Sequence, residues 1–220
     1  MKIKKIGIVG SGNIGGTLGT LLAKAGYDVL FSSRHPDGLK DLVKGAGPRA
    51  CAGTLAEAIS FGDVIVLSVP FKAVPELSPE IKMSLRNKIV IDTSNPYSER
   101  DGVIADDARK DPGGMGTVIA RLLPGARIVR AFNTVYYVDL AKTTNKAGEK
   151  IGIPIAGDDP EGLEAAIELV KAAGLDPVVV GGLKASRSFD VGAAIYGTNP
   201  SAREIRDKLN LKPVEAKRAA

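Results

Sequence analysis

The chain has 220 residues, 44% of them hydrophobic and 25% charged, which is the composition of an ordinary globular domain rather than of a disordered or fibrous chain. Its length suffices for one substantial core, and its single cysteine, Cys51, excludes an internal disulfide and favours a cytoplasmic location. The formal net charge of +5 comes largely from residues 203–220, which hold six Lys or Arg against three Asp or Glu. Because no aromatic residue is interleaved with these charges, we expect residues 211–220 to be a loose basic tail, with no nucleic-acid partner.

The first residues resemble the start of a signal peptide, since several lysines precede an apolar run at residues 6–9. That run is far shorter than the ~20 apolar residues that a membrane span requires, and it leads directly into a series of glycines. We therefore expect residues 5–9 to form the first strand of the fold, and we expect no membrane partner.

The glycines after this strand follow the pattern G-x-G-x-x-G, in the segment Gly10-Ser11-Gly12-Asn13-Ile14-Gly15. The first glycine of this pattern permits a tight strand-to-helix turn, the second lets the backbone approach a pyrophosphate, and the third lets the helix pack on the strand. Apolar residues at helical spacing continue to Ala25, and Gly26 stands where a helix cap belongs. The pattern predicts a dinucleotide at the helix N-terminus; the alternative is a glycine-rich turn without a ligand.

The second strand, from residue 28 onward, ends in Ser32-Ser33-Arg34 with no acidic residue. An acid at this place accepts a hydrogen bond from the ribose 2′-hydroxyl of NAD. A hydroxyl and a guanidinium suit a 2′-phosphate instead, so the strand end predicts an NADP(H) site. The alternative for Arg34 is a solvated arginine before the turn at 35–38, and we expect His35 to be a surface residue or to lie beside that phosphate.

Further strands and helices alternate along the chain. We expect a weak strand at 49–52, with Cys51 as a small buried residue, and a short helix at 54–60. Apolar strands follow at 63–69, 88–92 and 126–132. A polar, glycine-rich stretch at 97–116 reads as a functional or disordered loop, which would include Met115.

Residues beyond about 150 repeat the pattern once, with a strand at 152–156, a helix at 160–173 and a strand at 177–180. The alternation predicts an α/β fold of the Rossmann type, a doubly wound, mainly parallel sheet with a C-terminal βαβ extension. No linker divides the chain, so we expect one domain over residues 1–210. The stretch 190–200 offers no evident partner within the chain, which favours a homodimer.

Taken together, several motifs resemble the NADPH-dependent coenzyme F420 reductases and the NADPH-binding domains of six-transmembrane metalloreductases. The resemblance extends over residues 3–185 and rests on the glycine turn, the strand end at 32–34 and the segments 68–70, 92–96, 130–134 and 155–159. It implies that NADP is held by the glycine turn, by the strand end with His35, and by Ser68, Val69, Pro70, Phe71, Ser94, Asn95 and Pro96. It also implies that the residues after the strand at 126–132 face a deazaflavin, with Asn133, Thr134 and Val135 beside the nicotinamide.

The electron acceptor is left open by this resemblance. The archaeal deazaflavin enzymes carry a His-Thr pair where this chain has Asn133-Thr134, and the Phe-Asn-Thr form is more similar to the metalloreductases. Coenzyme F420 or a flavin is the expected acceptor, because ring-to-ring hydride transfer needs alignment more than a proton donor and the only histidine lies at the adenine end.

Two other functions stay open: a reductase of a small carbonyl or imine, and a non-enzymatic NADP(H)-sensing module. For the reductase, Tyr136, Tyr137 or Lys142 could supply the proton, although packing is the commoner role of such a tyrosine pair. Asn133 could bind the nicotinamide or the acceptor, or could cap a helix that starts near Val138. No cluster of metal ligands is recognisable.

Overall fold

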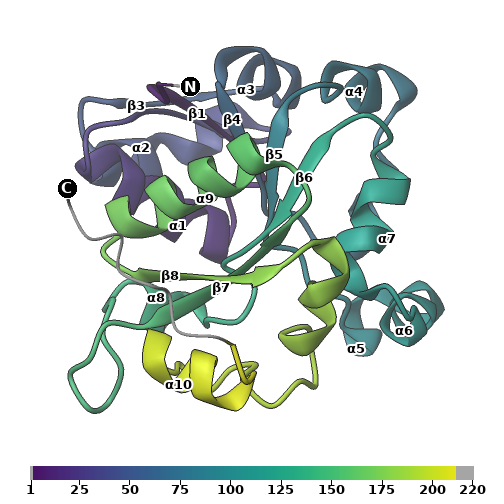
Figure 1. Cartoon of the computed structure of the whole chain (residues 1–220). Helices are drawn as coiled ribbons and strands as arrows, with labels where there is room; N and C mark the ends of the chain where they lie inside the picture. Colours follow the sequence, from purple (N-terminus) through teal and green to yellow (C-terminus); the bar gives the residue numbers. More distant parts are fainter. Residues whose placement is uncertain (1, 212–220) are drawn as a thin grey trace.

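The computed structural model of the chain describes residues 2–211 and consists of one eight-stranded sheet with helices on both faces (Figure 1). The strands lie in the order β3-β2-β1-β4-β5-β6-β7-β8. Their bounds are β1 Lys5–Val9, β2 Asp28–Ser32, β3 Ala50–Gly53, β4 Val64–Leu67, β5 Ile89–Asp92, β6 Arg127–Arg130, β7 Gly152–Gly157 and β8 Asp176–Gly181. The predicted α/β fold is confirmed.

The helices follow the alternation seen in the sequence. Their bounds are α1 Asn13–Lys24, α2 Lys40–Ala46, α3 Leu55–Phe61, α4 Pro79–Ser84, α5 Ser98–Asp101, α6 Val103–Lys110, α7 Gly114–Leu122, α8 Tyr137–Leu140, α9 Pro160–Ala172 and α10 Ala202–Lys208. Short 3-10 helices lie at Pro36–Leu39, Phe71–Ala73 and Leu183–Ser188. Helix α9 begins as expected, since the Asp159 side chain accepts a hydrogen bond from the Gly162 N–H at 2.8 Å.

The strands from β3 to β6 are parallel, whereas β7 pairs with β6 in the antiparallel direction and β8 runs parallel to β7. All four residues of β4 and of β5 are buried, as expected for central strands covered on both faces. The expected C-terminal βαβ unit is therefore present as β7-α9-β8, and it reverses direction where it joins the sheet.

Two apolar layers hold the helices to the sheet. On one face Leu18 and Leu22 of α1 share a core with Leu169 of α9, and on the other Ile59 of α3 shares a core with Ile119 of α7. Because both faces are covered, the carboxyl ends of β1, β4, β5 and β6 meet at one edge of the sheet, where open α/β sheets bind their ligands.

The stretch 97–116 corrects the expectation of a loop. It forms α5, α6 and the start of α7, and Met115 is 2% exposed within the core. The helices were not apparent because α5 has only four residues and α6 only eight, too few for an apolar period to stand out among polar residues.

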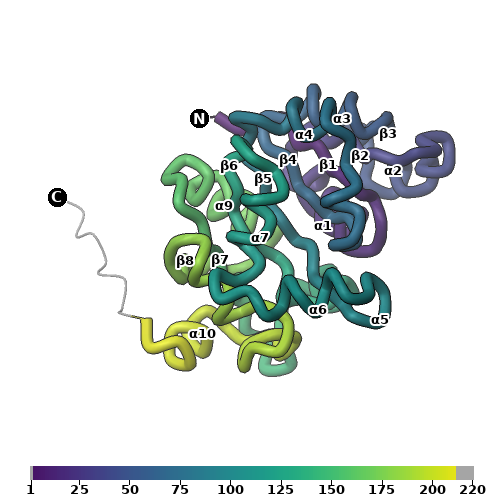
Figure 2. The backbone as a smooth tube through the Cα atoms, turned by 90° about the vertical axis from the view of Figure 1, so that its right-hand side faces the viewer, coloured from purple at the N-terminus to yellow at the C-terminus, as the bar shows by residue number. Residues whose placement is uncertain are grey.

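The C-terminal segment also differs from expectation. Phe189, Ile195 and Ile205 are fully buried in a cluster with Ala156 of β7 and Val178 of β8, so this segment has a partner within its own chain. Figure 2 shows it beneath β7 and β8, at the opposite end of the molecule from α2 and β3. The argument for a homodimer from an unpartnered segment is therefore wrong. The basic tail at 211–220 lies outside the described residues, apart from residue 211.

Cys51 corrects a third expectation. It lies in β3 as predicted, but its side chain is exposed rather than buried, because β3 is the edge strand of the sheet. Burial of part of the residue and the nearby Asp28 and Glu57 raise the pKa of its thiol, which makes a nucleophilic role less favourable still.

Candidate functional site

The glycine turn between β1 and α1 has the geometry that its sequence predicts. Gly10 has φ of +95°, and a Cβ there would lie 2.5 Å from the Ser68 carbonyl oxygen. A Cβ on Gly15 would lie 2.0 Å from the Gly10 carbonyl oxygen, so that glycine is required by packing alone. A Cβ on Gly12, in contrast, would meet no atom within 4 Å. This open face at the N-terminus of a twelve-residue helix is the cradle that a pyrophosphate needs.

The end of β2 divides into buried and exposed parts. Ser32 is buried, and its hydroxyl accepts a hydrogen bond from the Gly10 N–H at 3.3 Å, so it fastens the glycine turn to β2. The Ser33 hydroxyl accepts from the His35 N–H at 3.0 Å. Arg34 and His35 are exposed, and no ion pair of residues 2–211 includes Arg34. The guanidinium is therefore available to an anionic ligand at this strand end.

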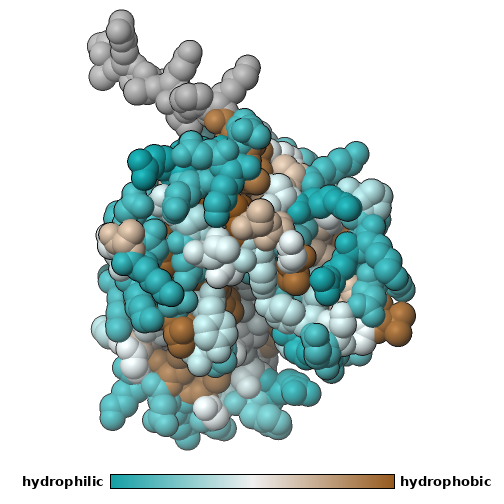
Figure 3. Space-filling model, turned by 90° about the horizontal axis from the view of Figure 1, so that it is seen from below, coloured by the Kyte–Doolittle hydropathy of each residue, from teal (hydrophilic) through white to brown (hydrophobic). Residues whose placement is uncertain are grey.

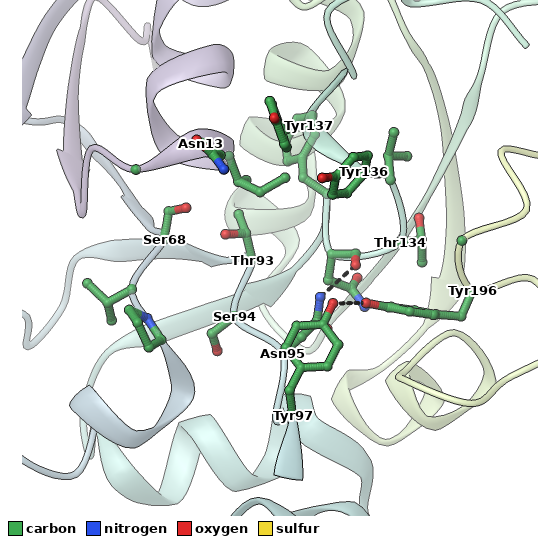
Figure 4. A pocket seen from close by; sticks show the side chains of 18 of the residues that line it. Asn13, Ser68, Thr93, Ser94, Asn95, Tyr97, Thr134, Tyr136, Tyr137 and Tyr196 are labelled. Atoms are coloured by element: carbon green, nitrogen blue, oxygen red, sulfur yellow. Dashed lines mark hydrogen bonds between the residues drawn. The ribbon is translucent and has the colours of Figure 1, made fainter. Parts of the chain in front are cut away.

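A cavity of about 500 Å³ extends from the glycine turn along the carboxyl edge of the sheet (Figure 4). Of the residues expected from the sequence it is lined by Gly12, Asn13, Ile14, Ser68, Val69, Pro70, Ser94, Asn95, Asn133, Thr134 and Tyr136. The other expected residues do not line the cavity. Gly10 and Ser11 lie in the turn before α1, and Gly15 lies in the first turn of that helix. Phe71 and Pro96 are buried, and the remaining four lie at the end of β2: Ser32, Ser33, Arg34 and His35.

The chain turns sharply into this cavity after β6. Phe132 is fully buried with φ of +61°, a conformation that a bulky residue rarely adopts and that is common near functional sites. Asn133 donates a hydrogen bond from Nδ2 to the Phe189 carbonyl at 3.2 Å, while its Oδ1 and the Thr134 Oγ1 are buried with no hydrogen-bond partner in the described chain. These two orphaned oxygens line the cavity and fit a polar ligand such as a nicotinamide carboxamide.

The helix-cap alternative for Asn133 is wrong. Helix α8 has Tyr136 as its N-cap residue, and no side chain caps it. Tyr136 itself is 61% exposed, and its ring meets the ring of Tyr137 edge to face with centroids 4.7 Å apart. Both tyrosines border the cavity, which supports a packing role and leaves a catalytic one open.

A buried arginine organises the loops around the cavity. The Arg130 guanidinium is fully buried at the end of β6 and pairs with Asp92 of β5 and with Asp190, whose Oδ1 lies 2.8 Å from Nε. It also donates to the Asn95 Oδ1 at 3.1 Å, and Asn95 in turn donates to the Asn133 carbonyl at 2.8 Å. Burial alone would lower the pKa of Arg130, but the two carboxylates raise it above its usual value. The cation is thereby fixed in place.

The end of the cavity away from the glycine turn is aromatic, and the sequence did not point to it. Tyr97 and Tyr196 meet there through their hydroxyl groups, which form a short hydrogen bond (Figure 4). The Arg100 guanidinium lies 5.1 Å from the centre of the Tyr97 ring. The Gly197 N–H donates to the Thr134 carbonyl at 2.9 Å, which joins the C-terminal segment to the predicted site. Only the position of Tyr97 directly after Pro96 could have indicated any of these residues.

Neither a metal site nor a membrane-spanning helix is found in the part of the chain that the structure describes. Residues 2–211 contain no group of three or more His, Cys, Asp or Glu placed to hold a metal ion. None of the helices in the same range is long and apolar enough to cross a membrane.

Comparison with known proteins supports the fold and shows what the chain is similar to. Residues 5–96 match the family described as NADP oxidoreductase coenzyme F420-dependent. The F420-dependent NADP reductase of Methanothermobacter thermautotrophicus is 29% identical over 204 residues, which cover 86% of this chain and 85% of that protein. The metalloreductase STEAP3 of Rattus norvegicus is 28% identical over 190 residues, 84% of this chain, but the match spans only 36% of that longer protein.

Among solved structures, a hypothetical protein from Sinorhizobium meliloti superposes with a TM-score of 0.75 at 26% identity, covering 91% of this chain and 96% of that one. The fold is therefore shared over nearly the whole length of both chains. Together with the match at residues 5–96, the relatives confirm the resemblance that the sequence indicates. This chain is similar in sequence to the F420-dependent NADP reductases and to a metalloreductase over about a third of that protein's length.

Proposed function

We propose that this chain is an NADPH-dependent oxidoreductase that exchanges a hydride with a deazaflavin such as coenzyme F420, or with a similar flavin-like ring. The observation that carries the proposal is a continuous cavity of about 500 Å³, which begins beside Gly12 at the glycine turn and ends among aromatic side chains. A cavity of this form has room for a nicotinamide and for a second ring placed next to it. The relatives named for F420-dependent NADP reduction support the same acceptor.

The chain's own residues would bind and orient the dinucleotide. The first N–H groups of α1 and the bare backbone of Gly12 would face the pyrophosphate, and Ser33 with Arg34 would bind the 2′-phosphate. Ser68, Val69 and Pro70 would border the ribose and nicotinamide half, where Asn133 Oδ1 and Thr134 Oγ1 offer acceptors without partners. NADPH, when bound, supplies the hydride.

The cavity favours transfer between two rings over reduction of a small carbonyl or imine. A carbonyl or imine reductase needs a positioned proton donor, and because the one histidine, His35, does not line the cavity, that donor would have to be one of the tyrosines that do. Tyr136 is largely exposed at the cavity wall, and we propose that it borders the acceptor rather than acts as an acid. Alignment of the two rings is then the main task of the protein.

The proposal is tested by following NADPH oxidation with purified protein and a panel of acceptors: coenzyme F420, FMN, FAD and a ferric chelate, with NADH run in parallel. We expect turnover with F420 or with a flavin, and a clear preference for NADPH. Turnover only with a carbonyl or imine would replace this function with the small-molecule reductase. Tight NADPH binding without reduction of any acceptor would point to the sensing module.

We also propose a cytoplasmic location and a homodimer. The cytoplasm is a reducing compartment, in which the exposed thiol of the one cysteine stays free. The homodimer now has no support from the C-terminal segment, so light scattering at several protein concentrations decides it. A constant mass of one chain would rule it out.

A further inference from the structure

Two hydroxyl groups at the far end of the cavity are unused by the function proposed so far. Tyr97 precedes α5 and Tyr196 lies in the C-terminal segment, and within residues 2–211 their hydroxyl groups bond only to each other. Two hydroxyls carry two protons, and their mutual hydrogen bond uses one of them. One O–H therefore remains uncommitted at the surface of the cavity.

The position of this pair is fixed from several sides. Gly197, next to Tyr196, donates its N–H to the Thr134 carbonyl at 2.9 Å, and the Tyr196 N–H donates to the Ala193 carbonyl at 3.0 Å. Arg100 lies over the Tyr97 ring and is itself held by Asp101, with Nε 2.8 Å from Oδ1. Because the donor already has its position before a ligand binds, it can stabilise a developing charge without a rearrangement of the protein.

The pair lies beyond Asn133 and Thr134 as seen from the glycine turn. In Figure 4, Asn13 and Ser68 stand on one side of the cavity and Tyr196 on the other, with Thr134 and Asn95 between them. A nicotinamide placed by Asn133 and Thr134 would leave the tyrosine end for the second ring. Burial and the hydrogen bond to Tyr97 raise the pKa of Tyr196, so its hydroxyl stays a donor at neutral pH.

We infer that the Tyr97–Tyr196 pair receives the polar edge of the acceptor ring, and that its uncommitted O–H donates a hydrogen bond to the atom on which negative charge develops when the ring is reduced. This inference rests on the proposed function. In the step concerned, a ring carbon of the acceptor gains the hydride, and the electron pair that it displaces moves to a nitrogen or oxygen at the edge of the ring. The acceptor class is thus a flat heteroaromatic ring with a carbonyl or imide edge.

The test compares Tyr196→Phe with the unchanged protein in two measurements. One is the dissociation constant of F420 in its oxidised and in its reduced form, from the fluorescence and absorbance of the ring. The other is kcat/KM for F420 with NADPH. We expect Tyr196→Phe to weaken binding of the reduced form about 10- to 100-fold and that of the oxidised form much less, because the donor acts on developed charge. The value of kcat/KM should fall by a similar factor.

Two further variants complete the experiment. Tyr97→Phe combined with Tyr196→Phe removes both hydroxyls; because each single variant leaves one hydroxyl of the pair, we expect the double variant to lose more than Tyr196→Phe. Tyr27→Phe removes a hydroxyl that bonds to Glu168 outside the cavity, and it should leave both measurements unchanged. Equal losses for oxidised and reduced F420, or no loss with the variant that lacks both hydroxyls, would overturn the inference while the proposed function stands. Absence of reduction of F420, FMN and FAD alike by the unchanged protein would instead overturn the proposed function.

Discussion

At the scale of single residues, we propose that the exposed guanidinium of Arg34 gives this chain its preference for NADPH. It follows the end of β2 with no acidic neighbour in the chain, and no ion pair among residues 2–211 engages it. Ser33 beside it keeps a hydroxyl proton, because that hydroxyl accepts rather than donates in its bond with the His35 N–H. Both groups are therefore free to bind a 2′-phosphate, whereas a carboxylate at the same place would repel it.

Replacing Arg34 with alanine tests this role. A hydrogen bond to a charged group contributes about 1.5–3 kcal/mol, so we expect Arg34→Ala to raise the dissociation constant of NADPH roughly 10- to 150-fold. Binding of NADH, which lacks the phosphate, should hardly change. Isothermal titration with both cofactors measures this, and Arg49→Ala, an exposed arginine paired with Asp28, is the matched control. An equal loss for NADPH and NADH would contradict the assignment.

At the scale of elements, the turn from β1 to α1 combines two kinds of glycine. Gly15 lies against the Gly10 carbonyl, which leaves no room for a side chain. Gly12 faces open space at the start of α1, and the protein itself gives no reason for a glycine there beyond a tolerated N-cap. We therefore attribute the glycine at position 15 to packing within the fold and the glycine at position 12 to ligand binding.

Two alanine variants distinguish the packing requirement at Gly15 from the ligand-binding requirement at Gly12. Gly15→Ala should destabilise the protein by about 1–3 kcal/mol, because the new Cβ must displace backbone. Gly12→Ala should cost about 1 kcal/mol or less and should still weaken NADPH binding by at least about tenfold, since the methyl group occupies the approach of the pyrophosphate. Thermal unfolding with and without NADPH measures both effects. Unchanged NADPH binding by a folded Gly12→Ala protein would move the pyrophosphate away from this turn.

At the scale of the whole molecule, the cavity is complete only when the C-terminal segment has folded onto the sheet. Tyr196 arrives from this segment, and the buried Arg130 joins β6 to β5 and to Asp190 of the same segment. The face seen in Figure 3 is mostly hydrophilic, with small, separate apolar patches. On that face, nothing resembles the broad apolar surface of an obligate interface.

Arg130 gives the prediction at this scale. Arg130→Met leaves Asp92 buried without its cation, and loss of one partner of a buried pair costs about 3–5 kcal/mol. At 2–4 °C per kcal/mol for a domain of this size, the melting temperature should fall by about 6–20 °C. Arg121→Met removes an exposed partner of Asp111 and should cost less than about 1 kcal/mol.

If Arg130→Met does not fold, Arg130→Lys provides a second measurement. It keeps the charge, but its donors are all on one nitrogen, which cannot reach the four acceptors that the three separate guanidinium nitrogens of Arg130 reach, so we expect an intermediate loss of stability. A melting temperature equal to that of the unchanged protein would show that the network contributes nothing to stability.

Those parts of the fold that depend on local signals could be predicted from the sequence. The glycine turn, the apolar strands at β1, β4 and β5 and the N-cap at Asp159 each depend on residues a few positions apart. Parallel strands joined by helices then have few possible arrangements, which is why the α/β fold and its ligand-binding edge follow from spacing alone.

What the tertiary structure alone decided depends on contacts between distant residues. The antiparallel docking of β7 on β6 and the burial of Ser32 under Gly10 leave no mark in a local pattern. Tyr97 and Tyr196 are 99 residues apart, and only the folding of the C-terminal segment onto the sheet brings their hydroxyls together. The sequence by itself thus determined the fold class and the glycine turn, whereas the tyrosine end of the cavity was decided by packing, because its residues converge from separate elements.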